Sequence, residues 1–598
     1  MKRYLAVAII LLAVFASSAP ALRNGFVWDD TALILRDPLI RSWRLIPEGF
    51  NHYLFVDATA SDFYRPIQRL TYTLEYAAFA FWPMPYHLIS ILLHGAAALA
   101  LFFLAEELLG LFHIEPKKCR TVAFFAALVW AIHPVHNAAV VYISGRADPL
   151  AALFGFLGIY LILRTRRVSQ RASLLLWIAA TIALLLSALS RETGLMFPLL
   201  GLALFALQKN WNAMAKTALA GAFVAVLYLS LRMAAEHVPP PVLRPPPPLL
   251  VRPILVARAV AEYAGLIVFP LNLHMERDID IHPGSFTAAS WTAAAWRELQ
   301  TLLGLVLVAA LIYWAICARK RNPPVFAALV LAALSYLPVS GIFALNASVA
   351  EHWIYVPSAF LFLAAALQFA SAAAWRRPAI VIGQVAFALW LVFLGARSFV
   401  RSFDWKDQRT FLERTISASG DSARMLINLG ELDLSEGKLP DAATHLHTAL
   451  QKQPDQPFAI VDLAAVALKQ KDFKVARQLL VRATVMPPVA AHAYELLAVL
   501  EFQENKRVDL LRFRLASRTG APNWSIEKRY VQALDATGAT ERAVTELKIC
   551  LATEWYRGES WQLLGELFAK SGHQAEASEA LAHARAYDVH LNNHGNSS

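Results

Sequence analysis

The sequence contains little charge and little cysteine. Of its 598 residues, 17% are Asp, Glu, Lys or Arg, whereas a soluble globular protein carries about 25%. The three cysteines, Cys119, Cys317 and Cys550, lie far apart, so they predict neither a disulfide framework nor a cysteine metal cluster. A single soluble enzyme, a disordered chain and a disulfide-built secreted module are therefore excluded.

The shortage of charge is confined to the first two thirds of the chain. Residues 401–598 are about 25% charged, with 24 basic and 25 acidic residues, whereas residues 1–400 are about 12% charged. The net charge of +11 thus comes from the first part, and the soluble part has no basic excess that would indicate nucleic-acid binding. We predict a membrane domain over 1–397 and a soluble domain over 398–598.

Eleven apolar runs are long enough to cross about 30 Å of hydrocarbon. They lie near 4–21, 87–109, 121–140, 148–163, 172–189, 193–208, 213–231, 299–318, 325–345, 354–374 and 378–396. The first run follows Lys2 and Arg3 as in a signal peptide, but so many spans come after it that we expect an uncleaved anchor. Segment 254–272 carries Arg258 and Glu262, so we expect an interfacial or re-entrant helix there.

Lysine and arginine in the short loops predict the orientation. Basic groups fall on alternate turns, and all six lysines of residues 1–400 lie on one side, which we assign to the cytoplasm. Eleven spans then place the amino terminus inside, and place the carboxyl-terminal domain outside with two long loops, 22–86 and 232–298. The second loop contains prolines at 239–241 and 245–248, typical of an extended linker. Twelve spans would place the carboxyl-terminal domain inside.

The soluble part shows a repeat of about 34 residues. Leu429-Gly430, Ala443, Ala449 and Pro454 recur as Leu463-Ala464, Ala476, Ala483 and Pro487, and Ala543 later recurs as Ala577. Small residues at these points let paired helices approach closely, which is the tetratricopeptide pattern. It is clear in the first two units, weak over 492–525 and intermediate over 526–590. Such units stack into a solenoid whose groove binds a peptide or partner, although a purely stabilising appendage is the alternative.

Acidic, basic and histidine side chains gather on the turns that this topology places outside. The candidate site residues are Asp29, Asp30, Arg65, His133, His136, Arg146, Asp148, Arg191, Glu192, Glu351, His352 and Tyr355. A carboxylate can deprotonate a hydroxyl nucleophile, and arginine binds phosphate and offsets charge on a leaving phosphate. The combination suits base catalysis beside an anionic phosphate ligand, with the apolar spans housing a lipid tail.

Each of these residues also has a structural interpretation. The Asp29-Asp30 pair could cap a helix or bind a cation, and His133 and His136 lack an obvious third metal ligand, which favours helix-end hydrogen bonding or phosphate contact. Arg146 could pair with Asp148, and Arg191 could pair with Glu192 through neighbouring residues. We expect His87 and His94 to pack or link helices. Two non-enzymatic classes compete with catalysis: a membrane-anchored repeat scaffold, and a transporter, which would place polar residues at mid-membrane depth.

The ordered motifs resemble a known family. Val27-Trp28-Asp29-Asp30, Tyr64-Arg65-Pro66, Tyr86-His87, His94, His133-Pro134-Val135-His136, Gly145-Arg146-Ala147-Asp148, Arg191-Glu192 and Tyr355-Val356-Pro357-Ser358 precede the repeats. This order resembles the transmembrane-and-tetratricopeptide-repeat proteins, which are related to the protein O-mannosyltransferases. The resemblance covers nearly the whole chain. It implies an all-α fold, a polytopic membrane bundle of the GT-C glycosyltransferase type followed by a tetratricopeptide-repeat α-solenoid.

The resemblance also implies a function. It implies inverting transfer of a sugar from a polyprenyl-phosphate donor to an acceptor hydroxyl on the non-cytoplasmic face, with a protein as the expected acceptor. Asp29 or Asp30 would be the base, while Arg65, His133, His136 and Arg146 would lie near the donor phosphate or support the site. The expected partners are membrane lipid, the lipid-linked donor, and a protein or peptide bound by the repeats, without nucleic acid.

The sequence departs from the family pattern at two places, of which the change at His352 bears on donor binding. Glu351-His352-Trp353 stands where the family often has Asp-Arg-Tyr, and Arg191-Glu192 stands where it often has Lys-Glu. The compact loops favour a bacterial inner membrane, with the site and the repeats in the periplasm. We expect no cofactor besides the donor and no metal site, and whether a divalent metal is needed stays open.

Overall fold

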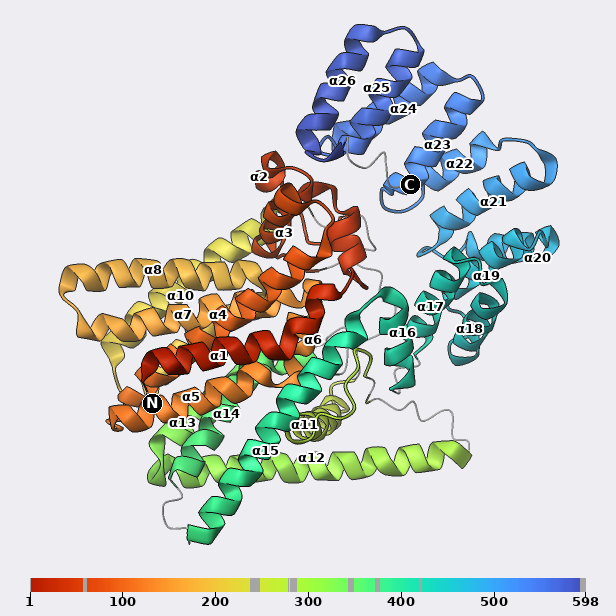
Figure 1. The fold of residues 1–598 in the computed structure, drawn as a ribbon. Helices are drawn as coiled ribbons and strands as arrows, with labels where there is room; N and C mark the ends of the chain where they lie inside the picture. The colour runs from red at the N-terminus through yellow and green to blue at the C-terminus, as the bar shows by residue number, and fades with distance from the viewer. Residues whose placement is uncertain are drawn as a thin grey trace.

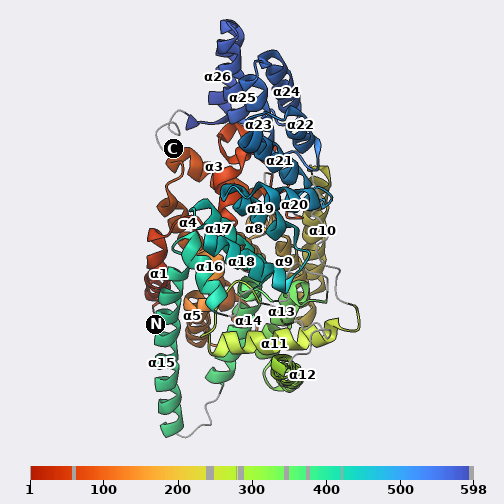
Figure 2. The same ribbon diagram turned by 90° about the vertical axis from the view of Figure 1, so that its right-hand side faces the viewer.

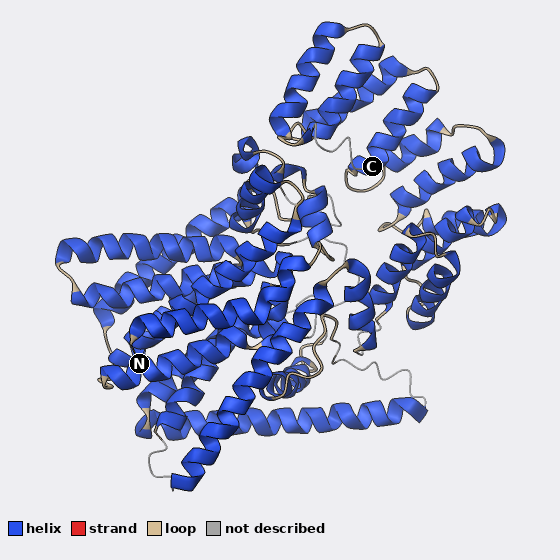
Figure 3. Cartoon of the chain, in the orientation of Figure 1, coloured by secondary structure: helices blue, strands red, loops and turns tan. Residues whose placement is uncertain are grey.

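The computed structural model of the chain is built from helices. It describes residues 2–56, 62–236, 248–277, 279, 288–342, 349–371, 377–418 and 422–591. Within these ranges there is no β-strand, only two isolated bridges, and the helices account for both parts of the chain (Figure 3). The predicted all-α class, a membrane bundle followed by a helical solenoid, is confirmed.

The first part is a bundle of long apolar helices that pack side by side (Figure 1). Its helices are α1 (Arg3–Ser18), α4 (Pro83–Gly110), α5 (Pro116–Ile132), α7 (Ala147–Arg164), α8 (Gln170–Ser190), α9 (Met196–Leu207), α10 (Trp211–Ala234), α12 (Ala288–Arg321), α13 (Pro323–Tyr336), α14 (Tyr355–Ala370) and α15 (Arg377–Arg401). Among the contacting pairs are α4 with α7, α7 with α8 and α13 with α14. Helices satisfy their own backbone hydrogen bonds, which is what a hydrocarbon environment requires.

Eight of the described helices are long and apolar enough to span a membrane. The pair Pro116–Ile132 and Pro134–Val140 bends by 53° at its break, so it is either a ninth, broken span or a re-entrant loop. Two shorter apolar helices, Glu192–Leu207 and Pro323–Val339, correspond to the predicted runs near 193–208 and 325–345. The chain is thus built as an integral membrane protein.

Helix α11 (Arg252–Val268) lies across the bundle rather than along it. Figure 1 views α11 end-on while its neighbour α12 runs across the view, and Figure 2 reverses this relation. That is the orientation of a helix lying in the plane of a membrane surface. The predicted proline linker before it falls mostly on 237–247, outside the described residues.

The segment between α1 and α4 folds into compact turns on one end of the bundle. It contains α2 (Ile46–Gly49), α3 (Pro66–Phe79) and the short turns Thr31–Arg36, Pro38–Ile40 and Trp43–Leu45. Leu33, Ile34, Tyr72 and Tyr76 form part of a separate apolar core beneath these turns. The loop is therefore a folded platform.

The carboxyl-terminal part is a solenoid of helix pairs. After α16 (Gln408–Ser417) come α17 (Ala423–Ser435) with α18 (Leu439–Lys452), α19 (Pro457–Lys469) with α20 (Phe473–Ala483), α21 (Ala490–Asn505) with α22 (Leu510–Arg518), α23 (Trp524–Ala536) with α24 (Thr540–Thr553), and α25 (Gly558–Lys570) with α26 (Gln574–Tyr587). The weakly patterned stretch 492–525 thus also holds a helix pair. Gly430 and Gly565 occupy equivalent positions in two repeats, where the paired helices approach closely. A Cβ at Gly430 would lie 2.7 Å from Leu446, and a Cβ at Gly565 would lie 2.8 Å from Leu581.

Both ends of the solenoid are fastened to the platform. At its start, Gly25 N–H donates to the Lys406 carbonyl at 2.8 Å. At its far end, the Tyr76 hydroxyl bonds the Asp588 carboxylate at 2.8 Å and Val589 N–H donates to the Arg41 carbonyl at 3.1 Å. The repeats therefore arch from one contact to the other, as the blue and teal helices of Figure 1 show.

The close approach at Gly430 predicts a position-specific effect on stability. Gly430→Leu places a side chain against α18, and we expect the free energy of unfolding of the repeats to fall by about 1–3 kcal/mol or more. Glu431→Leu adds the same side chain one residue later on an exposed surface and should have little effect. Thermal unfolding of the purified protein in detergent compares the two, and equal midpoints would contradict the packing described here.

Candidate active site

Asp30 fastens the turn that follows α1 to the turn that precedes α7. Its Oδ2 accepts the Val27 N–H at 3.1 Å, and its Oδ1 accepts the N–H and the hydroxyl of Ser144 at 2.8 Å and 2.5 Å. Burial raises the pKa of Asp30 to about 7, against the lowering effect of these hydrogen bonds. Because both oxygens are occupied, Asp30 is suited to holding the turn rather than to accepting a substrate proton.

Asp29 is the freer carboxylate of the pair. It is partly exposed, its N–H donates to the Tyr142 hydroxyl at 3.1 Å, and that hydroxyl bonds its carboxylate. Burial raises the pKa of Asp29, while the Tyr142 hydrogen bond and the charges of Arg424 and Arg65 lower it. Burial and the two nearby carboxylates hold the pKa of Tyr142 well above its ordinary value, so its hydroxyl remains a donor.

Arg65 acts on Asp29 and belongs to the first of two neighbouring ion pairs. Nε and Nη2 of Arg65 contact Oε2 of Glu192 at 3.0 Å and 2.9 Å, and the Tyr64 N–H donates to the other carboxylate oxygen at 3.1 Å. Arg191 pairs with Asp148 through Nη1. Arg65 also acts electrostatically on Asp29 and on Asp148, so the two pairs and Asp29 form one charged cluster.

His352 joins this cluster from the short turn Glu351–Ile354 that precedes α14. The charges of both Arg65 and Arg191 act on its imidazole. Among the described residues, Nη1 of Arg65, Nη2 of Arg191 and the ring nitrogens of His352 have no hydrogen-bond partner. Six predicted residues therefore come together: Asp29, Arg65, Asp148, Arg191, Glu192 and His352. Their donors can bind an anion next to a carboxylate.

Arg146 is not part of the charged cluster. Its guanidinium is fully buried, contacts both oxygens of Glu75 at 2.6 Å, donates to the Tyr86 carbonyl at 2.7 Å and lies over the Tyr72 ring. The alternative pair with Asp148 is replaced by the pair with Glu75, and the position of Arg146 near a donor phosphate stays a prediction. Arg146 and Asp148 stand two residues apart where α7 begins, but Arg146 pairs with Glu75 of α3 and Asp148 pairs with Arg191 just after α8.

His133, His136 and Tyr355 point into the bundle core. His133 Nε2 bonds the Ile267 carbonyl at 2.9 Å, and His136 bonds the Trp130 carbonyl at 2.8 Å and the Ser358 hydroxyl at 2.9 Å. The Tyr355 hydroxyl bonds His94 at 2.6 Å. These are links between helices, as expected for His94. Within the described ranges, no group of three or more His, Cys, Asp or Glu side chains could hold a metal ion.

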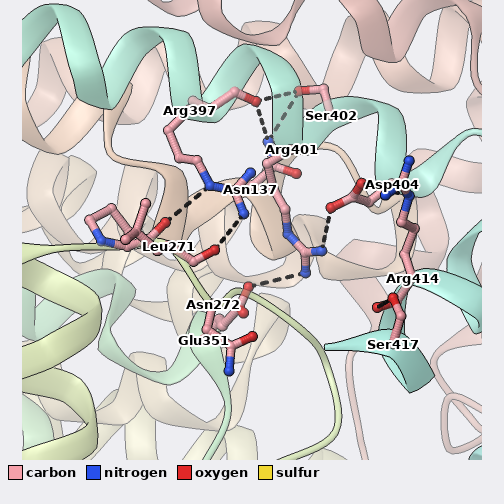
Figure 4. A network of polar contacts seen from close by, with 12 residues as sticks. Asn137, Leu271, Asn272, Glu351, Arg397, Arg401, Ser402, Asp404, Arg414 and Ser417 are labelled. Atoms are coloured by element: carbon pink, nitrogen blue, oxygen red, sulfur yellow. Dashed lines mark hydrogen bonds and ion pairs between the residues drawn. The ribbon is translucent and has the colours of Figure 1, made fainter. Parts of the chain in front are cut away.

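Glu351 lies in a second, separate polar network (Figure 4). Its fully buried carboxylate is 3.5 Å from guanidinium nitrogens of both Arg277 and Arg401. Arg401 also pairs with Asp404 at 2.8 Å, and Arg397 donates to the carbonyls of Pro270 and Leu271. Glu351 thus ties the segment after α11 to the end of α15, whereas the adjacent His352 reaches the charged cluster.

Sequence reasoning missed two residues next to Asp29. Tyr142 lies between the motifs that contain His136 and Gly145, and this position could have suggested it. Arg424 is in the first repeat, and its guanidinium is 5.5 Å from the Trp28 ring. Because no motif surrounds Arg424, the sequence offers no signal for it.

Known proteins match the chain over most of its length. A protein O-mannosyl-transferase of Caenorhabditis elegans is 25% identical over 462 residues, which are 74% of this chain and 63% of the relative. Protein O-mannosyl-transferase TMTC4 of Homo sapiens is 23% identical over 460 residues, 68% of this chain and 61% of the relative. The chain thus spans less than two thirds of the length of either relative.

The repeats match a known family model, and parts of the chain are similar to solved structures. A tetratricopeptide-repeat family model matches residues 433–500. ArnT from Cupriavidus metallidurans, solved with undecaprenyl phosphate, aligns over 83% of this chain and 80% of its own at 14% identity, with a TM-score of 0.35. The protein MamA aligns over 30% of this chain and 98% of its own at 14% identity, with a TM-score of 0.23.

The buried pair of Arg146 and Glu75 predicts a stability effect without a loss of substrate binding. Arg146→Met leaves Glu75 buried without its partner, and we expect the free energy of unfolding to fall by about 3–5 kcal/mol. Adding Glu75→Leu should restore much of it. Arg482→Met, which breaks the exposed pair with Asp455, should cost less than about 1 kcal/mol.

Thermal unfolding in detergent measures these differences. A double variant that folds but no longer binds a polyprenyl-phosphate sugar would contradict a purely structural role for Arg146.

The similarity to these relatives confirms the resemblance stated from the motifs: the chain has homologues named protein O-mannosyl-transferase across most of its length, and it carries tetratricopeptide repeats.

Proposed function

We propose that this protein is a membrane glycosyltransferase that moves a sugar from a polyprenyl-phosphate donor to an acceptor hydroxyl. The observation that carries the proposal is the Asp29 carboxylate, held by Tyr142 and flanked by Arg65 in a cluster that also contains Arg191 and His352. Relatives named protein O-mannosyl-transferase support a mannosyl group and a protein acceptor.

Asp29 is the proposed base. Its pKa is raised by burial, which strengthens it as a proton acceptor, and the surrounding positive charges still favour its ionised form. Asp30, with three hydrogen bonds to its carboxylate, keeps Asp29 in place. Of the two carboxylates that the sequence could not tell apart, the geometry favours Asp29.

Arg65, Arg191 and His352 are the proposed phosphate-binding groups. Arginine donates in parallel to two phosphate oxygens and keeps its charge at any physiological pH. Glu192 and Asp148 hold the two guanidinium groups in fixed orientations while other N–H groups stay available. His352 takes the place of the arginine that often stands at this point in the family.

The reaction is a direct displacement. Asp29 accepts the proton of the acceptor hydroxyl, whose oxygen forms a bond to C1 of the sugar while the bond from C1 to the phosphate oxygen breaks. The polyprenyl phosphate leaves with the electron pair, and its added negative charge is offset by the guanidinium groups. The sugar is transferred with inversion.

We place the reaction on the non-cytoplasmic side of the membrane, in the periplasm of a bacterium, where the repeats hold the acceptor or a partner. The concentration of lysine on the opposite loops supports this orientation. The domain division at about residue 397 is part of the same proposal.

The first test is transfer itself. Purified protein in detergent is incubated with a panel of radiolabelled polyprenyl-phosphate sugars and an acceptor peptide mixture, and we expect one sugar to be consumed. Asp29→Asn should lower kcat/KM by about a hundredfold or more while the protein stays folded. Glu48→Gln, a change of the same kind elsewhere in the platform, should retain activity.

The competing function is a membrane-anchored repeat scaffold. A scaffold would consume no sugar from the panel and would bind its partners equally well with Asp29→Asn. That pair of results would reject the transferase.

The raised pKa of Asp29 predicts how the rate depends on pH. The base must be ionised, so kcat/KM should rise with pH through the pKa of Asp29 and level off above it. Because burial raises this pKa, the increase in kcat/KM should occur at a pH above 3.8, the ordinary pKa of aspartate. A rate that is constant from pH 4 to pH 8 would contradict Asp29 as the base.

A further inference from the structure

Trp28, next to Asp29, has a backbone conformation that needs external support. Its φ is +54°, in the left-handed region that bulky residues rarely adopt. Its N–H donates to the side-chain carbonyl of Gln408 at 2.7 Å. Gln408 is the first residue of α16, the helix that opens the repeat domain. The soluble domain thus supplies a bond to the turn that presents the candidate base.

The junction before α16 also supports Tyr142, the other partner of Asp29. Trp405 stacks on the Tyr142 ring at 5.1 Å and on Phe411 at 5.1 Å, and the Phe411 ring lies 5.4 Å from that of Trp28. Asn24 donates to the Ser402 carbonyl at 2.9 Å. Residues 402–411 therefore contact the backbone and side chains on both sides of Asp29.

Arg424, in the first full repeat, adds a charge to this arrangement. Its guanidinium is 5.5 Å from the centre of the Trp28 ring, acts electrostatically on Asp29 and pairs with Glu276 of the second outer loop. Its side chain is 57% exposed, so no packing requirement accounts for its position. Arg424 connects three segments that are remote in the sequence.

We propose that the repeat domain completes the catalytic site: Gln408 fixes the turn that carries Asp29, and Arg424 supplies a positive charge near the Asp29 carboxylate. This inference depends on the proposed function, because it assigns positioning residues to the same proton transfer. It makes the solenoid a structural part of the active site in addition to any role in holding an acceptor.

Gln408 and Arg424 act in different ways, so their substitution should change different kinetic quantities. The groups that face Asp29 are Tyr142, Arg65, Arg424 and Asp30. Removing the Arg424 charge removes one of the two cations that favour the ionised carboxylate, so the pKa of Asp29 should rise. Removing the Gln408 acceptor leaves the charges unchanged and releases the Trp28 turn.

The test of Arg424 is the pH profile of kcat/KM for sugar transfer by the full-length protein. Arg424→Gln should move the acidic limb upward by about 0.5 pH units or more, with recovery at high pH, and Arg424→Lys should return it toward the original position. Arg482→Gln removes an arginine from a later repeat and should leave the profile unchanged.

The test of Gln408 measures two quantities, kcat and the pH at which kcat/KM rises on the acidic side of its profile. Gln408→Ala should lower kcat by about ten- to a hundredfold, because a small displacement of the base slows proton transfer, without moving the limb. Arg409→Ala removes a neighbouring side chain that forms ion pairs with Glu413 of α16 and with Asp433 and Glu436 of the first repeat, and this variant should retain kcat.

The outcomes distinguish this inference from the proposed function. If the unmodified protein transfers sugar but Arg424→Gln leaves the acidic limb in place and Gln408→Ala retains kcat, the repeat domain does not complete the site. If the unmodified protein consumes no sugar from the panel, the proposed function itself fails.

Discussion

The bonds of the buried Asp30 carboxylate to Ser144 and Val27 are the constraint on which the rest of the site depends. They join the end of the first span to the turn that precedes α7, two segments more than a hundred residues apart. Because Asp30 is held on both oxygens, its neighbour Asp29 faces Tyr142 and the arginines. The two aspartates are adjacent in sequence but have different environments. This difference is why we propose Asp29 as the base and assign Asp30 to holding the turn.

Much of the fold could be predicted from the sequence. The hydrophobic effect and backbone hydrogen bonding fix spans in a bilayer, so apolar runs such as 87–109 correspond to helices such as α4. Close helix approach requires small residues, so Gly430 and Ala449 revealed the repeats. The stretch 492–525 was harder to recognise, because its helix pair keeps the same shape with fewer of these small residues.

The candidate site could be predicted only in part. Helix ends on one face gather Asp29, Arg65, Asp148, Arg191, Glu192 and His352, and a topology is enough to group them. Which charge pairs with which depends on side-chain direction: Arg146 meets Glu75 of α3 instead of Asp148, and Glu351 turns away from its neighbour His352. His133 and His136 lie at the bend between α5 and the helix that follows it, and this bend directs their side chains into the core. The place of Arg424 near Asp29 could be found only from the three-dimensional structure, because Arg424 is remote from Asp29 in the sequence.

The attachment of the last repeat to the platform has a consequence for the synthesis of the protein. Tyr76 bonds Asp588 across 512 residues of sequence, so the ribosome releases the platform long before its partner exists. Until α26 and Asp588 emerge, the surface around Arg41 and Tyr76 stays uncovered, and contacts this distant in sequence form slowly. The platform therefore completes its packing only after α26 and Asp588 have been synthesised, and a variant lacking them would leave Arg41 and Tyr76 exposed to chaperones and proteases.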